Sequence, residues 1–280
     1  MKHLEGKIAA VTGAGSGIGQ ALAINLAQAG CHLALSDVDE SGLAETITLL
    51  ESYTVKITYQ KLDVSKKKDV YKWADKVVAD HGKVNLIFNN AGVALSGTVD
   101  ALSIEDYEWI MGINFWGVIY GTKAFLPYLE QSGEGHVVNI SSVFGLTSQP
   151  FMSGYNASKF AVRGFTESLR QDLEITNSNV TTTCIHPGGI KTNIAKSSRM
   201  NKSVEAITGS SKEDSLVEFE KMFIHTPDSA AKTIIKGVRK NARRVLIGVD
   251  ARMFDAVARV FPTGYQWLFT KAVKWRSKAA

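Results

Sequence analysis

The stretch Lys7-Ile-Ala-Ala-Val-Thr-Gly-Ala-Gly-Ser-Gly-Ile-Gly19 decides the fold of this chain of 280 residues. Its apolar first half predicts a buried strand, and a helical pattern of apolar residues begins at Gly17. Glycines at such a turn let a ligand approach the backbone closely, and the N-terminus of the following helix attracts a phosphate. A purely structural glycine turn is the alternative. The flanking strand and helix favour a nucleotide cradle, whose residues are Gly13, Ser16, Gly17, Ile18 and Gly19.

The rest of the chain alternates between strand and helix patterns. Strands are predicted at 7–12, 31–36, 55–60, 84–88, 135–141, 179–185 and 244–248, and helices at 17–29, 40–51, 66–81, 103–130 with a break, 153–175 and 227–240. This alternation predicts an α/β fold: a doubly wound (Rossmann) parallel sheet of about seven strands with helices on both faces. An apolar content of 45% is enough for one large core in a single domain. Ligands of such sheets bind beyond the carboxyl ends of the strands.

A tyrosine and a lysine stand one helical turn apart in Tyr155-Asn-Ala-Ser-Lys159, and Ser142 lies upstream at the end of a predicted strand. The four-residue spacing places Tyr155 and Lys159 on one face of a helix. An ammonium group beside a phenol is expected to lower the pKa of the tyrosine from its reference value of ~10. Tyr155 would then serve as an acid or base near neutral pH, and Ser142 would hold the same substrate oxygen. Taken alone, the spacing also fits an ordinary surface helix pair.

Six motifs resemble, in order and spacing, those of the classical short-chain dehydrogenase/reductase family, over about residues 5–250. They are Thr12-Gly-Ala-Gly-Ser-Gly-Ile-Gly19, Asn89-Asn-Ala-Gly92, Asn114, Ser142, Tyr155-x-x-x-Lys159 and Pro187-Gly-Gly189. The resemblance implies the strand order 3-2-1-4-5-6-7. It also implies hydride transfer between a nicotinamide and an alcohol or carbonyl compound, with Tyr155 as the acid/base and Lys159 also holding the nicotinamide ribose. Asn114 is implied as a fourth catalytic residue, which holds a local distortion of its helix.

The second predicted strand ends at Asp37, about 20 residues beyond the glycines. A carboxylate there is expected to hydrogen-bond the adenosine ribose and to repel a 2′-phosphate. The alternative is that Asp37 caps the next helix, a role that Asp39 or Ser41 could take instead. Neither Ser16 nor Val38 is basic, whereas basic residues at these places accompany NADP preference in the family. NAD is therefore the expected cofactor.

The resemblance implies further cofactor contacts at the ends of later strands. They are Asp63 and Val64 at the adenine, Asn90 near the ribose, and Ile190 and Thr192 at the carboxamide, besides Tyr155 and Lys159. Each has a structural alternative: Asp63 as an N-cap of the helix at 66, Asn90 as part of an Asx turn, and Pro187-Gly-Gly189 as an ordinary loop. We interpret His186 as strand-end packing, because no second ligand stands nearby at metal spacing, and we expect no metal site.

The substrate is expected to bind under residues 193–226, a connection long enough to be a lid. Its apolar residues are Ile194, Met200, Val204, Ile207, Leu216, Val217, Phe219, Met222 and Phe223, while Phe144, Leu146, Phe151 and Met152 flank Ser142 and Tyr155. These residues favour a bulky apolar alcohol or ketone (steroid-, retinoid-, fatty- or acyl-like) over a small sugar, unless some of them are simply core. The alternative function is a non-catalytic NAD-binding sensor or scaffold on the same fold.

The C-terminal region is strongly basic and aromatic. Residues 239–280 hold ten lysines and arginines against two aspartates, a net charge of +8, whereas residues 1–238 carry −3. The region also contains the large aromatic residues Phe254, Phe261, Tyr265, Trp267, Phe269 and Trp275. We therefore assign residues 1–249 to the dehydrogenase domain and residues 250–280 to an amphipathic extension, which Pro262 and Gly264 divide into two segments.

Four functions fit this extension: a peripheral membrane contact, packing over the active-site mouth, a subunit contact, and nucleic-acid binding. No nucleic-acid-binding motif accompanies the charge, so no nucleic-acid partner is expected. No signal peptide and no run of 18 apolar residues are present. Cys31 and Cys184 lie in apolar runs, as buried thiols in a reducing compartment do. A cytoplasmic homodimer or homotetramer is expected, membrane-associated where the extension makes a lipid contact.

Overall fold

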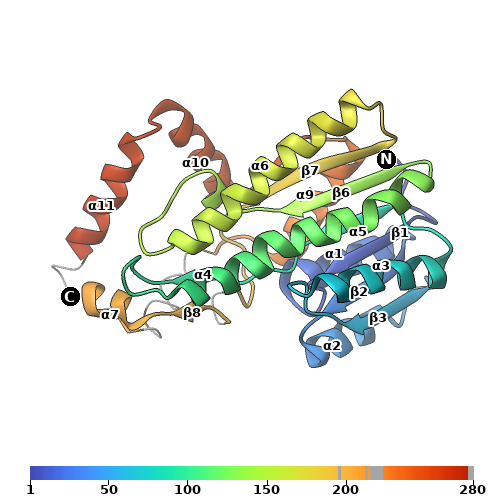
Figure 1. Ribbon diagram of the computed structural model, residues 1–280, viewed down its shortest axis with the longest axis horizontal. Coiled ribbons are helices and arrows are strands. Elements are labelled where there is room, and N and C mark those ends of the chain that lie inside the picture. Colours follow the sequence, from blue (N-terminus) through green and yellow to red (C-terminus); the bar gives the residue numbers. More distant parts are fainter. Residues whose placement is uncertain (195–196, 212–213, 215–222, 277–280) are drawn as a thin grey trace.

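A single sheet of seven parallel strands forms the centre of the computed structural model, which describes residues 1–194, 197–211, 214 and 223–276 (Figure 1). The strands are β1 (Ile8–Thr12), β2 (His32–Asp37), β3 (Ile57–Lys61), β4 (Leu86–Asn89), β6 (Gly135–Ile140), β7 (Val180–Pro187) and β9 (Arg244–Ile247). Their order across the sheet is β3-β2-β1-β4-β6-β7-β9. Counted along these seven strands alone, the order is 3-2-1-4-5-6-7, which confirms the predicted topology. The order reverses between β1 and β4, and ligands of such folds bind at this switch point.

Helices cover both faces of the sheet, as predicted. They are α1 (Gly17–Gln28), α2 (Glu40–Leu50), α3 (Lys67–His81), α4 (Ile104–Met111), α5 (Gly117–Gln131), α6 (Ser153–Ile175) and α9 (Pro227–Arg239). Helices α1 and α9 pack together over one face, while α3, α5 and α6 cover the other. The apolar strands supply both cores because successive side chains alternate between the faces. In β1, Ile8 and Ala10 join the core under α3 and α5, and Ala9 and Val11 join the core under α1 and α9.

Three features of the fold depart from a plain alternation of strands and helices. The predicted break in the helix at 103–130 is a single π-helical turn, Gly112–Trp116, between α4 and α5. A second, two-stranded sheet pairs β5 (Leu95–Ser96) with β8 (Arg199–Met200), and no sequence pattern predicted it. A short 3-10 turn, Val143–Gly145, follows β6.

The predicted lid is described only in part. The helix α7 (Lys202–Thr208) lies within it, after β8, whereas Leu216, Val217, Phe219 and Met222 lie outside the described residues. The C-terminal extension consists of α10 (Val249–Val260) and α11 (Gly264–Arg276), divided near Pro262 and Gly264 as predicted. None of the helices in the described ranges has the length and apolar character needed to cross a membrane.

Candidate active site

The glycine turn between β1 and α1 has the backbone shape that a phosphate cradle requires. Gly13 and Gly17 adopt positive φ angles of 66° and 54°, a conformation that other residues rarely adopt. A β-carbon on Gly19 would overlap the carbonyl oxygen of Gly13, so only glycine fits there. Ser16 is the N-cap residue of α1, but its side chain makes no capping hydrogen bond. The first turn of α1, which includes Ile18, therefore follows a turn that can receive an anion at its N–H groups.

Asn90 holds this turn in place from the end of β4. Its side-chain amide donates hydrogen bonds to the carbonyl oxygens of Thr12 and Gly13, at 2.9 Å and 3.1 Å. The Thr12 hydroxyl in turn accepts from the backbone N–H groups of Asn90 and Ala91. The two strands on either side of the switch point are thus joined by side chains at the base of the cradle. Sequence reasoning gave Thr12 no role, although it stands in the motif.

Asp37 lies at the rim of the cradle and does not cap the next helix. One of its carboxylate oxygens accepts from the Gly15 backbone N–H at 2.7 Å, and the other accepts from Asp39 N–H at 2.9 Å. The cap of α2 is Asp39, whose side chain accepts from the Ser41 N–H. The capping alternative for Asp37 is therefore wrong, and its carboxylate is oriented by the glycine turn.

The structure also shows what Asp63 and Val64 contact. Asp63 accepts from the backbone N–H and the hydroxyl of Ser65, at 2.9 Å and 2.7 Å. The N-cap residue of α3 is Lys66, with no side-chain cap, so the capping alternative for Asp63 is wrong as well. Val64 is buried against Gly117, where a β-carbon would lie 2.8 Å from a Val64 methyl group. Both residues follow β3 at the carboxyl edge of the sheet.

Ser142, Tyr155 and Lys159 converge beside the cradle. Ser142 is the N-cap of the 3-10 turn after β6, and its hydroxyl accepts from the Phe144 N–H at 3.1 Å. Tyr155 and Lys159 lie on the buried face of α6, with exposed fractions of 8% and 3%. The Lys159 ammonium donates to the carbonyl oxygen of Ile140 at 3.1 Å and lies 5.6 Å from the centroid of the Tyr155 ring. The burial of this pair excludes the reading of an ordinary surface helix pair.

Burial dominates the electrostatics of the pair. It raises the pKa of Tyr155 to about 12, an effect that hydrogen bonding with Ser142 partly opposes. It lowers the pKa of Lys159 to about 8. The predicted net lowering of the Tyr155 pKa is therefore wrong for the chain by itself. The free energy lost when the phenolate is removed from water is larger than the stabilisation that its neighbours provide.

Asn114 lies in the π-helical turn and is fully buried. Its amide nitrogen donates to the Val93 carbonyl at 2.9 Å and to the Ser158 hydroxyl at 3.1 Å, and its oxygen accepts from the Val93 N–H at 2.8 Å. These bonds tie the segment after β4 to α6 next to Lys159. The predicted distortion of the helix at Asn114 is present, and Ser158 is a partner that the sequence did not suggest.

The loop after β7 closes over the cradle. Ile190 pairs with His225 in an isolated parallel bridge, and the Lys191 N–H donates to the His225 carbonyl at 2.9 Å. Thr192 reaches Gly17, because a β-carbon on Gly17 would lie 3.0 Å from the Thr192 methyl group. The loop predicted to cover the nicotinamide therefore borders the turn predicted to hold the pyrophosphate.

Two polar residues support this region in ways that the sequence did not reveal. The carboxylate of Asp250, in the first turn of α10, accepts from the Gly189 N–H at 2.6 Å and lies 3.7 Å from the His225 imidazole. His186 is buried, and its Nδ1–H donates to the Ser142 carbonyl at 2.9 Å. Burial lowers the pKa of His186 to about 4, so the imidazole is neutral near pH 7. His186 thus orients the serine as well as packing at the strand end, as predicted.

Apolar side chains surround Tyr155. They form a buried cluster of Ala94, Leu95, Leu102, Ile110 and Met152, with Trp109, Phe144 and Ile194 partly buried against it. The Phe144 ring meets the Tyr155 ring edge to face, with centroids 5.8 Å apart. The immediate surroundings of the Tyr155 ring are therefore apolar.

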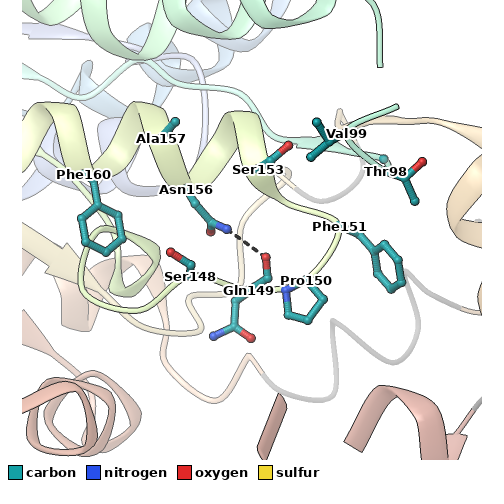
Figure 2. Close-up of a pocket in the computed structure, with 11 residues that line it drawn as sticks. Thr98, Val99, Ser148, Gln149, Pro150, Phe151, Ser153, Asn156, Ala157 and Phe160 are labelled. Carbon is teal, nitrogen blue, oxygen red and sulfur yellow. Dashed lines mark hydrogen bonds between the residues drawn. The ribbon is translucent and has the colours of Figure 1, made fainter. Parts of the chain in front are cut away.

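A hollow of about 650 Å³ lies on the face of α6 that is turned away from Tyr155 and Lys159 (Figure 2). Its α6 residues are Ser153, Asn156, Ala157 and Phe160, and its far wall is the 148–151 loop, whose Gln149 carbonyl accepts from Asn156. At about 100° per residue, these positions face away from Tyr155 and Lys159. The hollow is therefore separate from the side chains of Tyr155 and Lys159.

Comparisons with known proteins identify the family of this chain. A sequence profile of the short chain dehydrogenase family matches residues 7–203. A Mycobacterium tuberculosis protein named as an oxidoreductase, SadH, is 46% identical over 275 residues, which cover 98% of this chain and 97% of that protein. The crystal structure of a short-chain dehydrogenase/reductase from Burkholderia phymatum, in complex with NAD, is 32% identical with a TM-score of 0.82 and covers 88% of this chain and 90% of its own. An alcohol dehydrogenase of Thermococcus sibiricus, complexed with 5-hydroxy-NADP, is 28% identical with a TM-score of 0.71 over 87% and 96% of the two chains.

Proposed function

Because the chain belongs to the short-chain dehydrogenase/reductase family and is an oxidoreductase, we propose that it transfers a hydride between NAD(H) and a bulky apolar alcohol or ketone. The observation that carries this proposal is the convergence of Ser142, Tyr155 and Lys159 beside the glycine cradle. The Asn114 amide ties α6, the helix of Tyr155 and Lys159, to the segment that follows β4. A non-catalytic sensor or scaffold is not favoured, since such a protein has no need of this buried set.

The protein's part of the reaction is the handling of one proton. When bound, NAD would supply the hydride acceptor or donor. In the oxidation direction, the Tyr155 phenolate takes the hydroxyl proton of the alcohol, and in the reduction direction the Tyr155 hydroxyl gives it to the carbonyl oxygen. The Ser142 hydroxyl holds that same oxygen, and Lys159 holds the ribose hydroxyls with its ammonium group.

The charge of Lys159 supplies much of what Tyr155 needs to act as a base. Lowering the tyrosine pKa from about 12 to near 8 requires ~5 kcal/mol of preferential stabilisation of the phenolate. At 5.6 Å from the ring centroid, a unit charge contributes ~3 kcal/mol for an effective dielectric constant of ~20. The remaining ~2 kcal/mol is within reach of the positive charge of oxidised nicotinamide. Lys159 therefore tunes the phenol only as part of an assembled site.

The preference for NAD over NADP is part of the proposal. Its support is the Asp37 carboxylate, which the Gly15 N–H orients at the rim of the cradle, together with the absence of a basic residue at Ser16 and Val38. A 2′-phosphate beside that carboxylate would meet an uncompensated like charge. The carboxamide contacts through Ile190 and Thr192, the adenine contacts through Asp63 and Val64, and the ribose contact through Asn90 belong to the same proposal.

We further propose a cytoplasmic homodimer or homotetramer. The support for the compartment is that Cys31 and Cys184 are free, buried thiols, whose pKa burial raises to about 12. The support for self-association is two exposed aromatic side chains, Trp116 before α5 and Phe160 in α6, with exposed fractions of 46% and 36%. A lid over residues 193–226 and a division at residue 249 are parts of the same proposal.

A panel of alcohols and ketones tests this function. The full chain is mixed with NAD⁺ and each alcohol, or with NADH and each ketone, and the absorbance of the reduced nicotinamide is followed. Turnover that favours long or polycyclic apolar substrates and disappears in Tyr155→Phe supports the proposal. Cofactor binding without turnover of any panel member would favour the sensor or scaffold instead.

A further inference from the structure

The C-terminal arm, α10 with α11, stands at the edge of the molecule. Figure 1 shows α11 projecting away from the body, at the end opposite α3. The arm exposes unusually large apolar side chains for a protein surface: Trp267 is 62% exposed and Trp275 73% exposed. Clustered exposed apolar residues of this size indicate an interaction site.

The outer face of α10 is an apolar stripe with arginines beside it. Val249, Met253 and Val260 are exposed by 71%, 55% and 67%, and at about 100° per residue they fall on one side of the helix. Arg252 and Arg259 are also exposed and flank the stripe on one side. The inner side contains the fully buried Ala251 and the carboxylate of Asp255.

The outer face of α11 mixes indole rings with ammonium groups. Trp267, Leu268, Lys271, Lys274 and Trp275 are all exposed and lie within about 120° of one another around the helix. The Lys271 ammonium lies 4.6 Å from the Trp267 ring centroid. The opposite side of α11 packs inward, where Tyr265 is buried and Phe269 meets the rings of Tyr265 and Phe254. The two helices thus share one pattern: they anchor by their inner sides and leave apolar and basic groups outside.

The charges on the arm are segregated as well. Both of its acids point inward: Asp250 accepts from the Gly189 N–H, and Asp255 pairs with Arg244 and Arg259. Within the described ranges, Arg252, Lys271 and Lys274 form no ion pair. The outer face is therefore net positive. A symmetric contact with a second copy would bring this face against itself and oppose like charges.

We propose that this outer face docks on the surface of an anionic lipid bilayer. Tryptophan rings favour the boundary between headgroups and acyl chains, an apolar stripe gains by entering it, and lysine and arginine side chains extend back to anionic headgroups. A nucleic acid would use the positive charge but would gain nothing from Val249, Met253 and Val260. A lipid surface uses both the charge and the apolar stripe, so the observations favour it.

The arm is fastened to the loops of the active site at two points. The first is at Ser148, which lies between Ser142 and Tyr155 in the chain and whose N–H donates to the Tyr265 hydroxyl at 3.2 Å. The second is the Asp250 carboxylate, which accepts from the Gly189 N–H. Ser148 also lines the hollow of about 650 Å³, which is separate from Tyr155 and Lys159 (Figure 2). Docking would place this side of the molecule at the bilayer, where an apolar substrate dissolves. That consequence rests on the proposed function, whereas the docking itself does not.

Sedimentation of the full chain with vesicles tests the proposal. The chain should pellet with vesicles of phosphatidylcholine and phosphatidylserine at low salt, and less at physiological salt, where screening shortens to ~8 Å. Lys271→Gln with Lys274→Gln should weaken partitioning roughly thirtyfold, since each basic group near the surface contributes ~1 kcal/mol. Trp267→Ser with Trp275→Ser should weaken it at least roughly tenfold, through lost apolar burial.

The matched control neutralises two exposed lysines of α3, as Lys68→Gln with Lys72→Gln. It should bind as the unchanged chain does, because α3 lies at the far end from α11. No pelleting at low salt, or equal weakening by the α3 control, would overturn the proposal. So would tighter binding to a DNA duplex than to the vesicles, or a change of oligomeric state in the arm variants with vesicle binding unaltered. Turnover of a water-soluble substrate by the arm variants separates failure of this proposal from failure of the proposed function.

Discussion

Asp250 is expected to be a positioning residue for the loop over the nicotinamide, although it lies some 60 residues further along the chain. Its carboxylate accepts from the Gly189 N–H at 2.6 Å, and a β-carbon on neighbouring Gly188 would overlap it, so helix and loop are in direct contact. A hydrogen bond to a charged group contributes ~1.5–3 kcal/mol. If it orders the loop for the cofactor, Asp250→Ala should lower kcat/KM for NAD about 10- to 150-fold.

The assay is initial rates over a range of NAD concentrations at saturating alcohol, with the melting temperature measured in parallel. Asp250→Asn keeps an oxygen that can accept from the Gly189 N–H, so its kcat/KM for NAD should fall less than that of Asp250→Ala. Asp255→Asn is the matched control, because Asp255 pairs with Arg244 and Arg259 rather than with a residue of the loop. The KM of this variant for NAD should be unchanged. A kcat/KM in Asp250→Ala within about twofold of the unchanged chain, with equal melting temperature, would refute the reasoning.

Three further predictions concern charges. Asp37→Asn keeps an acceptor for Gly15 but removes the charge that disfavours a 2′-phosphate, so the ratio of kcat/KM for NAD to that for NADP should fall; an unchanged ratio would count against the Asp37 assignment. The rate of alcohol oxidation should rise with pH and then level off, because the base must be deprotonated, and Lys159→Met should move that rise upward by about two pH units in pH–rate profiles, since it removes ~3 kcal/mol. A profile that stays in place would contradict the role of Lys159. Burial lowers the pKa of His136 to about 3, so the unfolded chain takes up its proton near pH 6.5 while the folded chain does not; stability should fall as pH drops from about 6.5, measured as the urea midpoint, and His136→Gln should lessen the fall.

Local spacing was enough to predict the parts of the site that adjoin one another in the chain. The glycine turn, the Tyr155–Lys159 pair and the break at Asn114 are each set by a few consecutive residues. The seven strands of the sheet followed from apolar runs, and their order followed from the family resemblance. The two-residue strands β5 and β8 are too short to show any periodicity, so nothing in the sequence indicated their pairing.

Contacts between segments that are distant in the chain could not be predicted from the sequence. Asp250 and Tyr265 reach active-site loops only because β9 and α10 bring them there, and no motif marks either residue. The direction of the Tyr155 pKa was mispredicted for a related reason. The spacing identified the neighbouring ammonium group, but the extent of burial, which sets the larger effect, depends on side chains from several elements.

The most direct test of the central claim is the turnover number of Tyr155→Phe with NAD⁺ and the best alcohol of the panel, measured beside NADH binding. Phenylalanine keeps the ring that packs against Phe144 and removes only the hydroxyl that carries the proton. The account predicts unchanged NADH affinity and a kcat lowered ~10²–10⁴-fold, the usual contribution of a general acid/base. A variant that keeps more than about a tenth of kcat would contradict it.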